Sequence, residues 1–145
     1  MDIVGLLNDL TGGNLLLWKV IATTVVFALA GFQVLLAARL WEVTPFPPLA
    51  TTTAARLHRI SGRTAVILAA LVAVSCLAGP AGPVSPVRVL LHSVFGTLVL
   101  LTLAAKFAVL RVLRGGGRAL PWLGASLFVA FGAIWATSVA DYVAR

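Results

Sequence analysis

Four long runs of apolar residues, separated by short stretches rich in proline, glycine and arginine, dominate this chain of 145 residues. Apolar runs of about eighteen residues or more are long enough to cross a lipid bilayer as helices. Charged residues make up only 10% of the chain, whereas soluble domains carry about 25%. A chain with so little surface charge cannot keep its outer surface in water, so the sequence predicts an integral membrane protein.

Loop-forming residues mark where each run ends. The first connection reads WEVTPFPPLATTT, the second GPAGPVSP and the third RGGGR, all rich in residues that interrupt helices. The expected membrane spans therefore cover residues 14–40, 57–78, 86–113 and 120–143. With such short loops we predict an all-α fold in one domain, residues 1–145, built as an up-down bundle of four transmembrane helices.

Lysine and arginine are distributed unevenly between the two ends of these spans. Eight flank the first and third loops: Arg39, Arg56, Arg59, Arg63, Lys106, Arg111, Arg114 and Arg118. Only Lys19, Arg88 and Arg145 flank the opposite side. Because cytoplasmic loops are enriched in lysine and arginine, both termini are expected on the outer side of a bacterial cytoplasmic membrane. The net charge of +7 then reflects helix ends anchored at the membrane surface, not nucleic-acid binding.

The chain has two histidines, and both occur in the same short motif. Residues 57–62 read LHRISG and residues 91–96 read LHSVFG. Residues four apart share a helix face, so Gly62 lies one turn inward from His58 and Gly96 one turn inward from His92. The motif therefore predicts a histidine with an uncrowded helix surface beside it.

The two histidines are expected near opposite membrane surfaces. The spans at 57–78 and 86–113 are expected to be antiparallel neighbours, because the loop between them is short. At 1.5 Å per residue, His58 would lie about 30 Å from the outer end of its helix and His92 about 9 Å. A separation on the order of 20 Å along the membrane normal prevents one cofactor from binding both histidines within one subunit. The sequence predicts two separate sites.

A histidine beside a glycine on a membrane helix suits b-type haem. The imidazole nitrogen binds the iron, and the small neighbour leaves room for the flat ring. Cationic side chains at the same depth could pair with the haem propionates; the candidates are Arg59, Arg63 and Lys106 near His58, and Arg88 and Lys19 near His92. Further candidates for lining the outer site are Ser75, Trp135 and Thr137.

Structural explanations compete with this one. Glycine in membrane helices often only lets two helices approach closely, and a histidine near the surface can be an ordinary hydrogen-bonded group. His92 is deeper, where an ionisable group is costly and indicates function, yet a neutral imidazole bonded to Ser93, Ser75 or Thr137 would also be stable there. The polar residues inside the spans are expected to form interhelical hydrogen bonds: Thr23, Thr24, Gln33, Thr102, Ser126, Thr137 and Ser138.

The segments HRISGR, LLHSVFG, AAKFAVLR and IWATS, spread over about residues 55–142, resemble a family of uncharacterised four-helix membrane proteins from actinobacteria. That family is itself similar to the haem-binding cytochrome b561 and ferric-reductase transmembrane class. The resemblance implies electron transfer across the membrane through one or two b haems, with His58 and His92 as axial ligands.

One difference concerns the second axial ligand. A haem held by two histidines needs a second imidazole at the same depth, near the outer end of the second span. That position reads VSCLAG, with Ser75 and Cys76, and the only methionine is Met1. A haem at His92 would therefore be five-coordinate, or ligated by Cys76, Lys19, the second copy of a homodimer or another protein.

Two functions remain open on the sequence. The first is a small b-type haem protein, at most an electron-transfer component of an oxidoreductase, which passes electrons from a quinol or redox partner protein to an acceptor. The second is a cofactor-free membrane scaffold or accessory subunit of a larger complex. A channel or transporter is disfavoured because the spans contain no acidic residue at the midplane and no broken helix.

Overall fold

The structure, a computed structural model, describes residues 3–78, 85–112 and 116–143. Every regular element in these ranges is a helix: α1 (Ile3–Leu10), α2 (Leu15–Leu40), α3 (Thr51–Ala78), α4 (Pro86–Arg111), the short 3₁₀ helix η1 (Gly116–Ala119) and α5 (Leu120–Val143). Four of them, α2 to α5, are long and apolar enough to cross a membrane. The all-α fold is confirmed, and the chain is a multi-pass membrane protein.

The helix ends agree closely with the expected spans, except at α3. This helix begins at Thr51, six residues before the expected start at residue 57. Hydropathy reports contact with lipid and not helix formation, so it misses helical turns made of threonine, alanine and arginine outside the apolar layer. The last residue expected for the third span, residue 113, lies outside the described residues.

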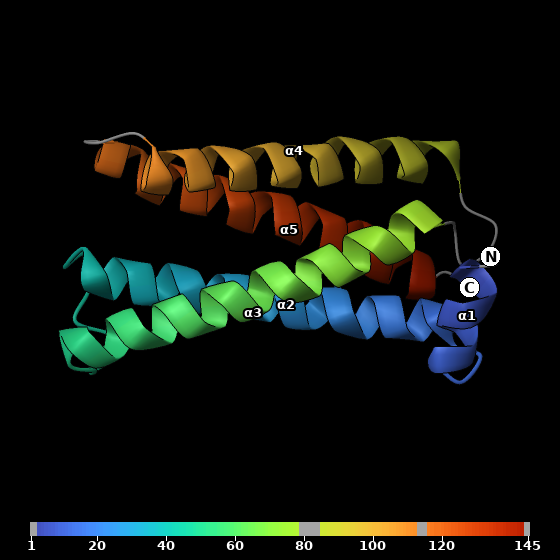
Figure 1. The fold of residues 1–145 in the computed structure, drawn as a ribbon, viewed down its shortest axis with the longest axis horizontal. Coiled ribbons are helices and arrows are strands. Elements are labelled where there is room, and N and C mark those ends of the chain that lie inside the picture. Colours follow the sequence, from blue (N-terminus) through green and yellow to red (C-terminus); the bar gives the residue numbers. More distant parts are fainter. Residues whose placement is uncertain (1–2, 79–84, 113–115, 144–145) are drawn as a thin grey trace.

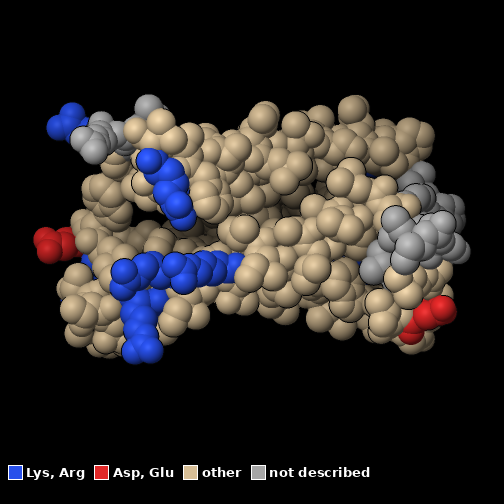
Figure 2. Space-filling model, in the orientation of Figure 1, with Lys and Arg blue, Asp and Glu red and all other residues tan. Residues whose placement is uncertain are grey.

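The four long helices form an open bundle. The central helix α2 packs against α3 and α5, and α4 packs against α5, which gives the order α3, α2, α5, α4 (Figure 1). The helices α3 and α4 run antiparallel, but they do not pack along their lengths as expected. A short loop holds only the adjoining helix ends together, whereas lengthwise packing depends on which side-chain faces fit. Figure 2 shows the resulting opening between the α2–α3 pair and the α4–α5 pair, here called the α3–α4 cleft.

Stacked aromatic rings hold α2 against α5. The Phe27 ring of α2 stacks on Phe128 and on Trp135 of α5, with ring centroids 5.2 Å apart in each pair. The Trp135 indole Nε1 donates a 3.0 Å hydrogen bond to the Thr24 hydroxyl of α2. A Cβ on Gly132 would lie 3.2 Å from the Phe27 ring, so the glycine allows this close approach. Stacked rings stabilise the contact beyond the area they bury.

Most hydroxyl groups inside the spans bond to their own helix. Each donates to a carbonyl three or four residues earlier in the chain, as Thr23, Thr102, Thr137 and Ser138 do. A helix can satisfy a buried hydroxyl in this way without help from a neighbour. Of the polar side chains expected to bridge helices, Thr24 and Gln33 do so within the described residues.

A short helix before the first span, α1, was not expected. It contacts α3 and ends at a turn in which Gly12 and Gly13 have φ of 63° and 80°, values that glycine adopts without strain. The Asn14 side chain then accepts a 3.4 Å hydrogen bond from the Leu17 amide and caps α2. The apolar spacing of IVGLLNDL, followed by two glycines, is the sequence signal that could have predicted this helix.

The two ends of the bundle differ in charge. The α2–α3 loop and η1 lie at one end, and α1 and the last turn of α5 lie at the other (Figure 1). Lys and Arg side chains gather at the loop end, on the left of Figure 2, and extend over the first half of α3. Both basic connections therefore share one end, as an up-down bundle requires.

Candidate functional site

Both histidines are partly buried, one on α3 and one on α4. Three buried side-chain nitrogen or oxygen atoms in the described residues lack a hydrogen-bond partner, and two of them are the Nδ1 atoms of His58 and His92. Neither Nδ1 atom bonds to a described residue, although the Gln33 backbone lies near enough to act on the His58 ring. Buried polar atoms in native proteins are nearly all hydrogen-bonded, so an unpaired one calls for an explanation. Each ring therefore carries a buried nitrogen that the described side chains leave unpaired.

Each histidine has its own cationic neighbours. Lys106 of α4 acts electrostatically on His58, whereas Arg88 of α4 and Lys19 of α2 act on His92. The helix α3 ends at Ala78 and α4 begins at Pro86, at the same end of the bundle. His58 and Lys106 lie equally far from these two ends, so they share one depth in the membrane. The structure thus groups side chains from different helices into a His58 site at the basic end and a His92 site at the opposite end.

The His58 site is bridged by Gln33 of α2. The Gln33 side-chain Nε2 donates to the His58 carbonyl at 2.8 Å and to the Ser61 hydroxyl at 2.5 Å. The Ser61 hydroxyl in turn donates to the Leu57 carbonyl at 2.7 Å. These bonds tie α2 to the part of α3 that carries the histidine motif.

The glycine of this first motif serves helix packing. A Cβ on Gly62 would lie 3.1 Å from the Gln33 Oε1 atom, which is closer than most real contacts of a Cβ. The space beside Gly62 is therefore filled by an amide side chain of the neighbouring helix. It is not an open surface for a flat ring, although the sequence motif suggested one.

The glycine of the second motif is different. A Cβ on Gly96 would meet no atom within 4 Å, so the α4 surface one turn from His92 is open. Arg88, one turn before His92, donates from Nε to the Thr137 carbonyl of α5 at 3.3 Å. This bond holds the guanidinium between α4 and α5, at the same depth as the imidazole. The His92 site thus combines an unpaired imidazole, a positioned cation and free space.

The hydroxyl groups that could have satisfied His92 do not bond to it. The Ser75 side chain is only 1% exposed and donates to the Val72 carbonyl at 2.7 Å. The Thr137 hydroxyl donates to the carbonyls of its own helix, and no bond joins Ser93 to the ring. The structure therefore gives no support to a histidine satisfied by a neighbouring hydroxyl.

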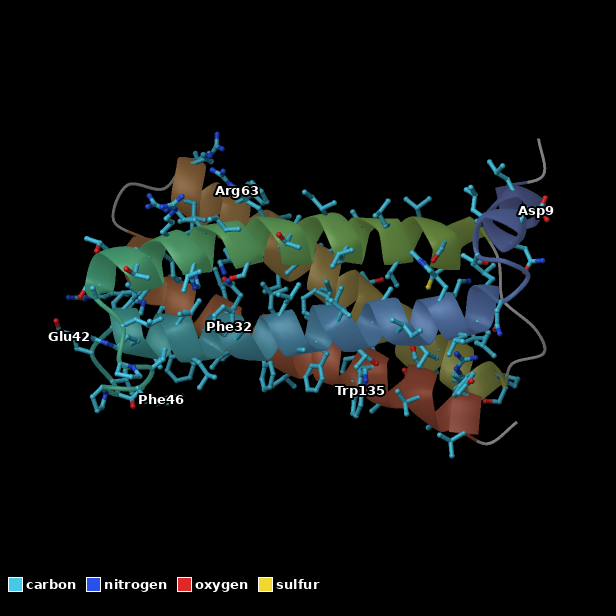
Figure 3. All side chains as sticks on the ribbon, turned by 90° about the horizontal axis from the view of Figure 1, so that it is seen from below. Asp9, Phe32, Glu42, Phe46, Arg63 and Trp135 are labelled. Atoms are coloured by element: carbon cyan, nitrogen blue, oxygen red, sulfur yellow. The ribbon has the colours of Figure 1, made fainter. Side chains whose placement is uncertain are left out.

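The other residues predicted to line a haem site do not share one environment. Lys19 is 9% exposed and lies within electrostatic range of Cys76 and Arg88. Trp135 belongs to the α2–α5 contact, where its indole nitrogen is bonded. Arg59 and Arg63 are exposed on α3, and Figure 3 shows Arg63 on the side of that helix turned away from α2.

No three His, Cys, Asp or Glu side chains gather into a possible metal site within residues 3–78, 85–112 and 116–143. A single histidine can still hold a metal ion whose other ligands come from a cofactor. Haem is such a cofactor, because its ring supplies four nitrogen ligands and the protein supplies only the axial ones.

The Gln33 bridge predicts a stability effect that is separate from any cofactor. We expect Gln33→Leu to lower the melting temperature in detergent, because interhelical hydrogen bonds in membrane proteins contribute about 0.6 to 2 kcal/mol. Thr64→Val is the matched control, since the exposed Thr64 hydroxyl bonds only to the Ile60 carbonyl of its own helix. Equal melting temperatures for Gln33→Leu and the unchanged protein would contradict a stabilising bridge.

Comparison with known proteins adds a family assignment. The family described as "Family of unknown function (DUF6529)" matches residues 7–145, which includes all four long helices and both histidine motifs. No curated protein and no solved structure matches the chain. The match covers nearly the whole sequence, and the chain therefore belongs to the DUF6529 family, whose function is unknown.

Proposed function

We propose that this protein is a small b-type haem protein of the membrane that transfers electrons across the bilayer. The observation that carries the proposal is the His92 site: a buried imidazole nitrogen without a partner beside an α4 surface that is open at Gly96. An ionisable side chain inside a membrane is costly and is retained for function. The resemblance of the sequence to a membrane-protein family that is itself similar to the cytochrome b561 and ferric-reductase class supports the same function.

The residues of the His92 site suit the parts of a haem. His92 would bind the iron, and Arg88 and Lys19 would supply positive charge for the propionates. The Thr137 carbonyl fixes the Arg88 side chain by a 3.3 Å hydrogen bond, which keeps the charge at the depth of the imidazole. When bound, b-type haem supplies a one-electron carrier whose potential depends on its axial ligands and surroundings.

The His58 site suits a haem less well. Its imidazole is also unpaired and has Lys106 nearby, but Gln33 fills the space beside Gly62. A ring on that face would require Gln33 to move and to break its bonds to α3. We therefore expect one haem per chain, at His92, which exchanges electrons with a quinol or a redox partner protein near that surface. Transfer across the whole bilayer would need a second carrier at the depth of His58.

The absorption spectrum of the detergent-purified protein tests this proposal. The air-oxidised and dithionite-reduced forms are compared, and a pyridine haemochrome assay then counts haems per chain. A Soret band that shifts on reduction, with one haem per chain, is the expected result. Two haems per chain would show that the His58 site also binds one. One haem per two chains would indicate that a homodimer supplies the second axial ligand from its other copy.

A cofactor-free scaffold or accessory subunit is the second candidate. The observation that favours it is the contact of Gln33 with Gly62, because there the histidine motif serves helix packing. A featureless spectrum from cells supplied with haem would overturn the haem proposal and leave the scaffold. Such a subunit would be identified by co-purification of a larger complex.

The orientation of the protein in the membrane is part of the proposal. The uneven distribution of lysine and arginine supports an orientation with the basic end in the cytoplasm of a bacterial cell. In a Cys76→Ser background, we expect Leu10→Cys to react with a membrane-impermeant maleimide in intact cells. Both Leu10 and Val43 are well exposed, at 74% and 78%, but Val43→Cys should react only after permeabilisation. Labelling of Val43→Cys alone in intact cells would reverse the orientation.

A further inference from the structure

Basic side chains form a stripe on the first half of α3. Arg56, Arg59 and Arg63 are all exposed and follow the spacing of residues that share one helix face. Neither α3 nor α4 contains an acidic residue. The nearest acid in the sequence, Glu42, lies in the α2–α3 loop, and Figure 3 shows it at the tip of the bundle, well away from Arg63. The charge of this stripe is therefore not neutralised by α3 or α4.

Arg63 is the deepest member of the stripe. It lies about 7 Å further along α3 than His58, which shares its depth with Lys106 of α4. Beyond Arg63, the apolar part of α3 at residues 64–78 rises only about 22 Å, whereas the hydrocarbon layer of a bilayer is about 30 Å thick. The Arg63 backbone thus lies inside the apolar layer, where a charged side chain extends toward the surface and pairs with an anion.

The α3–α4 cleft opens beside this stripe. Because α3 packs on α2 and α4 packs on α5, the two pairs leave an opening between them, with Lys and Arg side chains gathered at one end (Figure 2). An opening in the side of a membrane bundle is accessible to lipid chains. Basic pockets between transmembrane helices on the cytoplasmic side are places where anionic lipid head groups bind.

We propose that the basic end of the α3–α4 cleft binds an anionic phospholipid. Its phosphate lies among Arg59, Arg63 and Lys106, and one of its acyl chains enters the cleft between α3 and α4. The lipid belongs to the leaflet on the side of the basic loops. Charge complementarity selects this occupant, because Lys and Arg side chains gather at this end of the opening (Figure 2) and neither α3 nor α4 contains an acid. The site does not depend on whether His92 binds haem.

Lipid titration of the delipidated full-length protein in detergent tests this proposal. Native mass spectrometry measures the affinity for phosphatidylglycerol and for phosphatidylcholine with the same acyl chains. We expect tighter binding of phosphatidylglycerol, and a loss of about fivefold in Arg63→Gln, since one cation near anionic lipid contributes about 1 kcal/mol. The control Arg118→Gln removes an exposed cation of η1 at the same end of the bundle and should change the affinity by less than about twofold.

Several outcomes would overturn the lipid site. Equal affinity for the two lipids would exclude charge recognition, and an equal loss in Arg63→Gln and Arg118→Gln would show only a general surface charge. Equal affinity for inorganic phosphate and for phosphatidylglycerol would show that the acyl chain contributes nothing to binding. Loss of haem absorbance in Arg63→Gln would show that these cations pair with the propionates of a haem at His58 and not with a lipid. Unchanged melting temperatures without lipid confirm that the variants are folded.

Discussion

The variant His92→Ala is expected to lose nearly all haem absorbance, whereas His58→Ala keeps it. The two substitutions remove the same side chain from two copies of one motif, so they are matched controls for each other. His92 has open helix surface beside it, but the surface beside His58 is occupied by Gln33. Removing a residue that only hydrogen-bonds to a metal-binding side chain already lowers the metal affinity tenfold to a hundredfold. Loss of the ligand itself should therefore leave about a tenth of the haem per chain or less.

This comparison also separates the competing functions. The variants are expressed in parallel, and the Soret absorbance of each is divided by its protein concentration. Loss of haem in His58→Ala alone would move the site to the basic end and contradict the assignment to His92. Equal loss in both would indicate that the two histidines act together, which requires either two haems or a dimer. Absence of haem from the unchanged protein would favour the scaffold.

Substitution of the two motif glycines is expected to give opposite results. In Gly62→Leu, the Cβ of the new side chain would lie only 3.1 Å from the Oε1 atom of Gln33. The rest of the leucine side chain would then collide with the Gln33 amide. Overpacking of this kind costs about 1 to 3 kcal/mol, and it also breaks the bonds that Gln33 makes to α3. We expect a lower melting temperature in detergent and a haem content that changes little in the protein that remains folded.

In Gly96→Leu, the new side chain enters space that no atom occupies within 4 Å of the Cβ. Glycine is a poor helix former, so its replacement should stabilise the helix by up to about 1 kcal/mol. The melting temperature should therefore stay the same or rise slightly. The same side chain fills the surface proposed for the haem ring, so the haem content should fall severalfold. Gly96→Ala is the smaller control and should retain haem. Full haem content in Gly96→Leu would show that the ring does not lie on this face.

The membrane fold follows closely from the sequence. Apolar runs, loop residues and the distribution of arginine predicted four spans in an up-down order, because a lipid environment leaves the backbone few alternatives to helices. The start of α3 at Thr51 was missed, since helix formation continues where lipid contact ends. The helix α1 was missed because its short apolar pattern does not span a membrane.

The candidate site was predicted only in part. The sequence identified both histidines and the cations near each of them, since depth along a helix follows directly from residue number. It could not distinguish the two glycines, because the motifs LHRISG and LHSVFG contain the same histidine and glycine at the same spacing. What distinguishes them is Gln33, which lies on a different helix.

The sequence by itself determined that this chain crosses the membrane four times and carries one histidine near each end of the bundle. Only the tertiary structure decided which helices pack together and what lies beside each histidine. The reason is that hydropathy and spacing act along one helix, whereas packing depends on side chains that meet from several helices. The order α3, α2, α5, α4 brings Gln33 to Gly62, leaves Gly96 open and separates α3 from α4.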